Sequence, residues 1–104
     1  MPHPNRGEVW LADLGIAAKT RPCLVLSIPP DSQDRVLVTL VPHTTSVQGT
    51  HFEVAILKPF LKPGAFDAQG LATVSKPRLL RKLGNLQPAE LASIEAAVRR
   101  WLGL

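Results

Sequence analysis

The sequence contains a single cysteine, Cys23, and no tyrosine among its 104 residues. One thiol cannot form an internal disulfide, and it cannot supply the paired cysteines of a structural zinc site. Cys23 lies inside an apolar run, so we expect a buried and inert thiol. With 45% hydrophobic residues, the chain has enough apolar material to build a modest core instead.

Long apolar segments are also missing. No stretch approaches the roughly 20 apolar residues that cross a bilayer as a helix. Residues 1–6 lack the apolar region of a secretory signal peptide. We therefore expect a cytoplasmic protein without a membrane segment.

Acidic residues are outnumbered, because 12 Lys and Arg stand against 8 Asp and Glu, for a net charge of +4. This balance favours polyanionic or acidic partners, although ordinary surface charge gives the same number. A chain of this length suits one domain spanning residues 1–104. Such a small domain buries a limited share of its surface, and dimerisation would help it.

Established metal and catalytic motifs are absent from the sequence. The three histidines, His3, His43 and His51, are not spaced like ligands on a helix, and a His43/His51 pair alone offers too few ligands for zinc. No phosphate-binding glycine loop, dinucleotide motif or GxSxG elbow occurs. We expect neither a metal nor a cofactor.

What the sequence does contain is a series of short apolar and β-branched segments separated by turn residues. Such spacing predicts a small all-β sheet or barrel. Loops are expected at 15–20, 29–34, 42–50 and 58–70. The predicted strands are 7–14, 23–28, 36–41 and 52–57, with shorter ones at 71–74 and 82–86.

The last segment has a helical pattern. Pro88 suits the first helical position, Glu90 the first turn, and Gly103 a stop. An apolar stripe recurs at helical spacing and should pack on the barrel or support a dimer. Its members are Leu91, Ile94, Val98, Trp101 and Leu102. The predicted class is thus mainly β (α+β), a small barrel or half-barrel capped by an amphipathic helix.

Two polar positions at strand ends could bind a phosphate. Arg21 precedes Pro22, which favours an extended backbone, and its planar guanidinium can hold two phosphate oxygens. Pairing of Arg21 with Asp13 or Glu8 on the surface is the competing interpretation. The hydroxyl cluster Thr44, Thr45 and Ser46 can likewise donate to phosphate oxygens, or merely cap a turn.

Taken in order, several segments resemble the MazF/PemK family of type II toxin–antitoxin ribonucleases. The resemblance covers nearly the whole chain, including the terminal helix from Leu86 to Leu104. The matching segments are Arg6-Gly7-Glu8-Val9-Trp10 with Leu11-Ala12-Asp13-Leu14, Arg21-Pro22-Cys23-Leu24-Val25-Leu26-Ser27, Val41-Pro42-His43-Thr44-Thr45, Phe52-Glu53-Val54 and Thr73-Val74-Ser75-Lys76-Pro77-Arg78-Leu79.

The resemblance implies an SH3-like β-barrel of the MazF/PemK/CcdB kind, forming a homodimer inhibited by a cognate acidic antitoxin. It implies metal-independent cleavage of single-stranded mRNA by the ribose 2′-OH, leaving a 2′,3′-cyclic phosphate and a 5′-OH. Carried over by motif, the catalytic pair is Arg21 and Thr44. The physical requirements agree, because the nucleophile is already positioned and the enzyme mainly stabilises charge on the phosphate.

Further roles follow for neighbouring residues. His43 has a suitable pKa range for proton transfer, but neighbours on an extended strand point to opposite faces, which argues against a shared site with Thr44. Two features depart from the family pattern: a short loop from Gly15 to Thr20, and Ala72 where several members have a basic residue. The expected RNA contacts are Lys19, Thr20, Thr45, Ser46, Lys76 and Arg78, with solvated surface charge as the alternative for the cations.

Two other functions remain open at this stage. The same barrel could be a non-catalytic module that binds nucleic acid or an acidic peptide. A related fold also serves toxins directed at DNA gyrase. The Arg-Pro and Pro-x-Thr-Thr steps favour RNA as the target.

Overall fold

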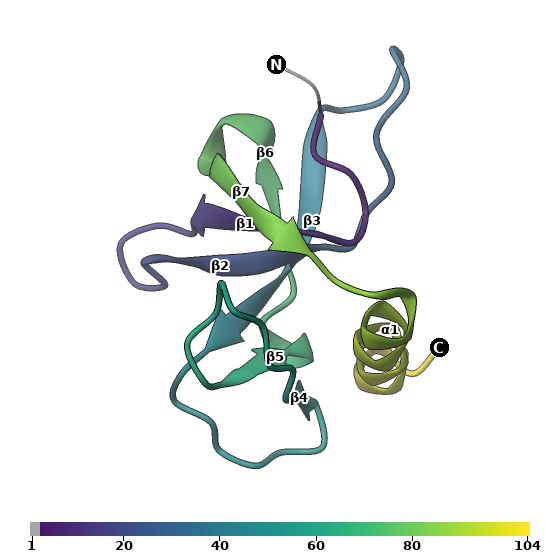
Figure 1. Ribbon diagram of the computed structural model, residues 1–104. Helices are drawn as coiled ribbons and strands as arrows, with labels where there is room; N and C mark the ends of the chain where they lie inside the picture. The colour runs from purple at the N-terminus through teal and green to yellow at the C-terminus, as the bar shows by residue number, and fades with distance from the viewer. Residues whose placement is uncertain (1–2) are drawn as a thin grey trace.

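Strands make up most of the regular structure in residues 3–104, the part of the chain that the computed structural model describes (Figure 1). A helix follows them at the C-terminal end, so the predicted class is confirmed. The strands are β1 (Glu8–Asp13), β2 (Thr20–Val25), β3 (Leu37–Thr44), β4 (Glu53–Val54), β5 (Ala65–Asp67), β6 (Ala72–Ser75) and β7 (Leu79–Asn85). Two 3-10 turns, η1 (Ala68–Gly70) and η2 (Lys76–Arg78), flank β6, and the helix is α1 (Pro88–Leu102).

The strands form one antiparallel, barrel-like sheet that does not close. Its order is β4-β5-β3-β2-β1-β7, with β6 also paired to β3. Strand β3 serves two partners along its length: residues 37–40 pair with β6, whereas His43 and Thr44 pair with Phe66 and Ala65 of β5. The end of β3 therefore lies where the two parts of the sheet meet.

Side chains from alternate positions of these strands enter two apolar clusters. Leu24 of β2 joins one cluster with Phe66 and residues of α1, whereas Cys23 and Val25 join the other with Trp10. Because both faces are covered at residues 23–25 of β2 and 40–41 of β3, these parts of the strands are continuous apolar runs in the sequence.

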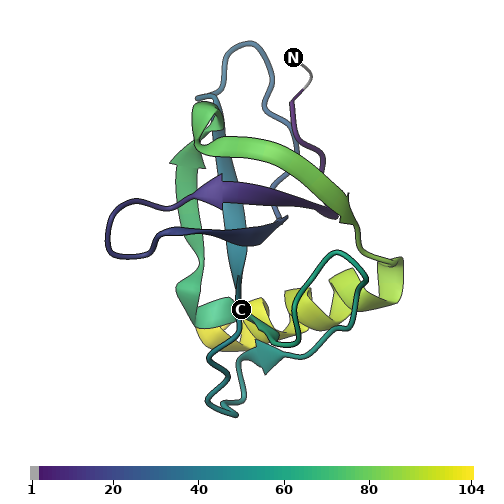
Figure 2. The ribbon, with the colours of Figure 1, turned by 60° about the vertical axis from the view of Figure 1, so that its left-hand side comes forward.

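Helix α1 begins as the sequence predicts. Pro88 occupies its first turn, and Gln87 and Glu90 form a reciprocal capping box, with the Gln87 backbone N–H 2.7 Å from Glu90 Oε1. Gly103 ends it with a φ of 72°, which glycine adopts readily. Figure 2 shows the helix lying along one end of the sheet, where Ile94 and Val98 are buried.

Several sequence predictions about the strands were wrong, and among them the strand expected at 23–28 lies at Thr20–Val25. The segment 42–50 was expected to be a loop, yet β3 continues through Thr44. The expected loop 58–70 contains β5, and the expected strand 52–57 is reduced to Glu53–Val54. In each case pairing with a strand distant in sequence decides the local structure, and local propensity does not contain that information.

The segment 58–64 lies directly against the end of β3. A β-carbon on Gly64 would come within 2.1 Å of the Thr44 carbonyl oxygen and 2.8 Å of His43 Cε1, so only a hydrogen fits there. At its other end, Lys58 Nζ lies 2.7 Å from Glu90 Oε1 of α1. Phe60 in turn packs on Gly84 of β7. These contacts fix one wall of the site described next.

Among the described residues, no helix is both long and apolar enough to cross a bilayer.

Candidate functional site

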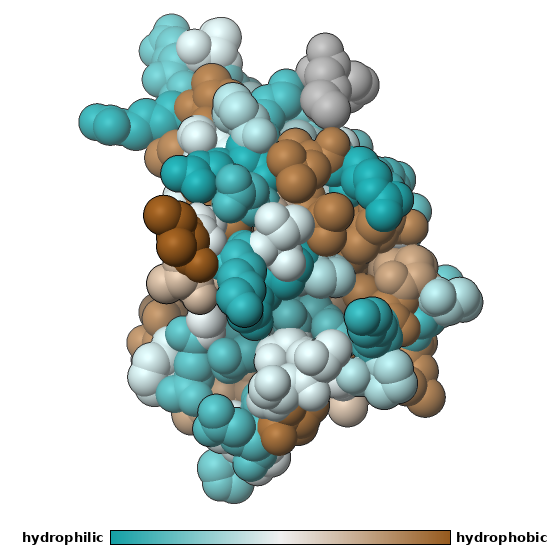
Figure 3. Space-filling model, turned by 90° about the vertical axis from the view of Figure 1, so that its left-hand side faces the viewer, coloured by the Kyte–Doolittle hydropathy of each residue, from teal (hydrophilic) through white to brown (hydrophobic). Residues whose placement is uncertain are grey.

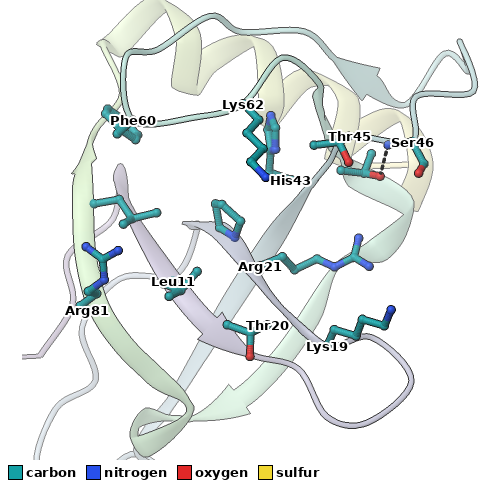
Figure 4. Close-up of a pocket in the computed structure, with 13 residues that line it drawn as sticks. Leu11, Lys19, Thr20, Arg21, His43, Thr45, Ser46, Phe60, Lys62 and Arg81 are labelled. Atoms are coloured by element: carbon teal, nitrogen blue, oxygen red, sulfur yellow. Dashed lines mark hydrogen bonds between the residues drawn. The ribbon is translucent and has the colours of Figure 1, made fainter.

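A pocket of about 430 Å³ opens between the start of β2, the end of β3 and the segment 58–64 (Figure 4). Its polar lining consists of cations and hydroxyls without a carboxylate, and apolar side chains form the rest. The cations are Lys19, Arg21, Lys62 and Arg81; the hydroxyls are Thr20, Thr44, Thr45 and Ser46; the apolar residues are Leu11, Pro22, Phe60 and Leu83; and His43 completes the wall. Figure 3 shows one side of the molecule, where hydrophilic side chains gather around the centre and apolar ones are scattered.

Arg21 is positioned by the loop that precedes β2. Its Nε donates to the Ala18 carbonyl oxygen at 2.9 Å, which fixes the side chain. This bond does not use the two terminal nitrogens of the guanidinium. In Figure 4 the guanidinium extends toward the Thr44-to-Ser46 turn. A half-buried guanidinium held in this way presents its planar fork to an incoming anion.

The alternative interpretation of Arg21, a surface ion pair, is wrong. Within the described chain, the two candidate carboxylates have other partners. Glu8 lies 3.2 Å from Lys82 Nζ and accepts from Trp10 Nε1, whereas Asp13 lies 3.8 Å from Arg78. The positive charge of Arg21 therefore has no carboxylate of the described residues within 4.0 Å.

Thr44 is the last residue of β3, so its backbone is fixed by pairing with Ala65. Its Oγ1 accepts the backbone N–H of Ser46 at 3.0 Å, which caps the turn that follows. Because that bond uses an oxygen lone pair, the hydroxyl hydrogen can still donate to a ligand. Capping a turn and binding a phosphate are thus compatible in this residue.

Arg21 and Thr44 come from different strands, yet they line the same pocket. They also line a second hollow, together with Ser46. The sequence predicted that these two side chains lie together at a barrel rim, and the structure brings them there.

His43 is buried, with 3% of its surface exposed, and its ring meets that of Phe66 edge to face at 5.1 Å. Burial lowers the pKa of the imidazole below its ordinary value of 6.5, so the ring is neutral at pH 7. Within the described chain its Nε2 has no hydrogen-bond partner. Although His43 and Thr44 are neighbours on a strand, both line the pocket, which wraps around the end of β3.

The expected RNA contacts fall into two groups. Lys19, Thr20, Thr45 and Ser46 all line the pocket with the Arg21–Thr44 pair. Lys19 has a φ of 63°, an uncommon conformation for a residue with a side chain, in the short loop between β1 and β2.

Lys76 and Arg78 lie elsewhere, in η2. Arg78 is paired with Asp13 and lines a separate hollow beside Gly15 and Thr73. Neither residue borders the pocket that holds Arg21 and Thr44. The structure does not bring them together with the predicted pair.

Two cations of the pocket, Lys62 and Arg81, were missed by the sequence analysis. Lys62 lies in the segment 58–70, which was expected to be a loop, and Arg81 precedes the strand that was expected to begin at 82. Arg81 pairs across the sheet with Leu11, and this register alone carries it to the pocket. Arg81 lies two positions before Leu83 and therefore on the same face of a strand. This spacing was the available sign that a basic side chain accompanies Leu83 in the pocket.

The predicted burial of Cys23 is confirmed, since the thiol is fully enclosed and forms no disulfide. Burial raises the pKa of the thiol to about 12, so it carries almost no thiolate at neutral pH. The described residues also hold no group of three or more His, Cys, Asp or Glu placed to bind a metal ion.

This fold and pocket define a small barrel-like β protein with a basic, hydroxyl-lined site. A family model described as PemK-like, MazF-like toxin of type II toxin–antitoxin system matches residues 5–102. The match takes in nearly the whole chain, and the protein therefore belongs to this family.

Solved structures agree with this assignment. An endoribonuclease from a mycobacterial species is 29% identical, with a TM-score of 0.81 over 100% of this chain and 95% of that chain. An endoribonuclease in complex with its cognate antitoxin, also mycobacterial, is 30% identical, with a TM-score of 0.82 over 97% and 96% of the two chains. MazF from Deinococcus radiodurans, 24% identical, has a TM-score of 0.83 over 100% of both chains and shows the shared fold.

Proposed function

We propose that this protein is the toxin of a type II toxin–antitoxin pair and that it cleaves single-stranded mRNA, with Arg21 and Thr44 as its catalytic residues. The observation that carries the proposal is a fixed arginine without a carboxylate partner among the described residues, placed with a threonine hydroxyl in one basic pocket. The endoribonucleases that share the fold at about 30% identity support it.

The chemistry follows from what these side chains offer. The ribose 2′-OH attacks the adjacent phosphorus while the bond to the 5′-oxygen of the next nucleotide breaks, giving a 2′,3′-cyclic phosphate and a 5′-OH. Arg21 neutralises charge that grows on the non-bridging oxygens, and the Thr44 hydroxyl donates to one of them. Since the nucleophile belongs to the substrate, no metal is required to generate it.

Two protons move in this reaction, one from the 2′-OH and one to the leaving 5′-oxygen. Arg21 is an unsuitable resting base because its guanidinium stays charged. His43 is the better acceptor, since its imidazole is neutral at pH 7 and lines the same pocket. We assign it the transfer of the 2′ proton, and solvent water supplies the proton that the leaving 5′-oxygen takes up.

We propose further RNA contacts at the remaining pocket residues and, farther along the RNA strand, at η2. We propose that Lys19, Thr20, Thr45 and Ser46, which line the pocket, hold phosphates on either side of the cut. We propose that Lys76 and Arg78 contact the RNA beyond the pocket.

The partners follow the family. We propose that the chain forms a homodimer and is inhibited by a cognate acidic antitoxin, in the cytoplasm where mRNA is found. The basic pocket suits an acidic segment, and one structural neighbour is described in complex with its cognate antitoxin.

The test is cleavage of an RNA panel in EDTA by the antitoxin-free protein. We expect Arg21→Ala and Thr44→Val each to lower the rate about 100- to 1,000-fold. Arg35→Ala is the matched control, because this exposed arginine of the β2–β3 turn lies outside the pocket. Full activity of Arg21→Ala would refute the assignment.

The two rival functions give different results in the same preparation. A protein that binds the RNA panel without cutting any of it is a binding module. Growth arrest with intact RNA and broken DNA would instead identify a toxin directed at gyrase.

A further inference from the structure

A second hollow, of about 280 Å³, is also lined by the Arg21–Thr44 pair. It shares Arg21, Thr44 and Ser46 with the first pocket. An RNA strand bound at these three residues therefore borders both hollows. Its other polar walls come from the loop between β3 and β4, from β4, from the end of β5 and from η1. They are Gln48, Thr50, Glu53, Asp67 and Gln69.

The two hollows differ in charge. Among the described residues, the first is lined by Lys19, Lys62 and Arg81 in addition to Arg21, and by no carboxylate. The second adds two carboxylates to Arg21, and no other described cation lines it. A phosphate is attracted to the first and repelled by the second, whereas a neutral group rich in N–H donors suits the second. In RNA that group is a nucleobase.

The two carboxylates do not have the same role. Both oxygens of Glu53 are occupied by backbone N–H groups of its own turn: Oε1 accepts from Thr50 at 2.7 Å, and Oε2 accepts from Gln48 at 2.9 Å. These bonds also lower the pKa of Glu53. Glu53 therefore shapes the rim of the hollow.

Asp67 lines the same hollow but has one carboxylate oxygen to which no described residue donates. Its Oδ1 accepts the backbone N–H of Gln69 at 3.0 Å and so caps η1. No donor among the described residues bonds its Oδ2. That oxygen lies beside Gly70, where an added β-carbon would stand 3.4 Å away from it.

We propose that this hollow binds the base of a nucleotide next to the cleaved phosphate and that Asp67 determines which base is accepted. The inference rests on the proposed RNA cleavage. A carboxylate oxygen accepts from an amino group, which adenine, cytosine and guanine carry on their pairing edges. Uracil presents two carbonyl oxygens beside its single N–H, and these oxygens repel the carboxylate. Asp67 therefore selects amino-bearing bases against uracil at one position.

Asp67→Asn isolates this role. The asparagine oxygen still accepts the Gln69 N–H and caps η1, so the fold is kept, while an NH₂ group replaces the open oxygen. Asp34→Asn is the matched control, since Asp34 also accepts a backbone N–H, from Asp31 at 2.9 Å, in a turn remote from both hollows.

The experiment sequences the 5′ ends of the fragments that each protein makes from RNA of mixed sequence. We expect uracil to be depleted at one position beside the cut for the unmodified protein and for Asp34→Asn. For Asp67→Asn we expect that depletion to shrink about tenfold or more.

Failure of the base subsite and failure of RNA cleavage give different results in this experiment. If Asp67→Asn cuts RNA with the same base frequencies as the unmodified protein, the base subsite is refuted and the ribonuclease stands. If the unmodified protein cuts no RNA, the ribonuclease is refuted and the subsite with it.

Discussion

At the scale of single residues, the burial of His43 couples the stability of the protein to pH. Its pKa is lowered in the folded state, so between that value and 6.5 the unfolded chain binds more protons than the folded one. Unfolding free energy should therefore rise with pH through this window and fall again on acidification. His3 acts in the same direction, since burial and the charge of Lys76 lower its pKa too.

The variant that checks this coupling is His43→Gln. Urea unfolding between pH 5 and pH 7.5 should show a shallower loss of stability at low pH than in the unmodified protein. His51→Gln serves as the control, because His51 is exposed in the turn before β4. Equal pH slopes in all three proteins would contradict the expectation.

Trp101 illustrates how exposure sets the cost of a substitution. If the helical stripe buried Trp101 fully, its truncation would cost about 3–5 kcal/mol. In the structure 44% of Trp101 is exposed, and its ring meets Phe52 edge to face at 5.2 Å.

We therefore expect Trp101→Ala to lower the unfolding free energy of the monomer by only about 1–2 kcal/mol. Ile94→Ala, which empties a fully buried position on the same helix, should cost about 2–5 kcal/mol. Urea unfolding measures both. A larger loss for Trp101 than for Ile94 would show that the tryptophan is covered in solution, for example by a second subunit.

At the scale of elements, the segment 58–64 depends on the missing side chain of Gly64. Gly64→Ala places a methyl group 2.1 Å from the Thr44 carbonyl oxygen, so the segment or the end of β3 must move. We expect a loss of about 1–3 kcal/mol in unfolding free energy. RNA cleavage should fall as well, because Thr44 and His43 border this contact.

The comparison is Gly49→Asn, in the turn before β4. Gly49 has a φ of 75°, which asparagine tolerates, and nothing lies within 4 Å of an added β-carbon. Stability and cleavage should both change little. Unaltered cleavage by a folded Gly64→Ala protein would show that the contact does not position the site.

At the scale of the whole molecule, the net charge of +4 matters through where its cations lie. If the four cations of the pocket each neutralise one phosphate, RNA affinity should fall with salt at a logarithmic slope of about −3. Arg81→Ala should reduce that slope by about 0.7, and Arg35→Ala should leave it unchanged.

Fluorescence anisotropy with a 2′-O-methyl RNA, which lacks the attacking hydroxyl, measures binding alone at several salt concentrations. A slope that Arg81→Ala leaves intact would place the RNA outside the pocket. The same titration with Lys76→Ala and Arg78→Ala tests the proposed contacts in η2.

The sequence alone determined the features that depend on neighbouring residues. Pro88, Glu90 and Gly103 mark the helix ends, because capping uses groups within a few residues. Apolar runs indicate β1, β2 and most of β3, because strands covered on both faces need apolar side chains at nearly every position. The motifs around Arg21 and Thr44 marked the predicted catalytic pair.

Only the tertiary structure decided the rest. The extension of β3 to Thr44 and the existence of β5 arise from pairing between residues about 20 positions apart. Lys62 reaches the first hollow through the close approach of Gly64 to β3, and Arg81 reaches it through the register of β1 and β7. Asp67 reaches the second hollow because it ends β5. Such placements depend on strand register and close backbone contact, and these are set when distant segments pack together, so no local pattern of residues records them.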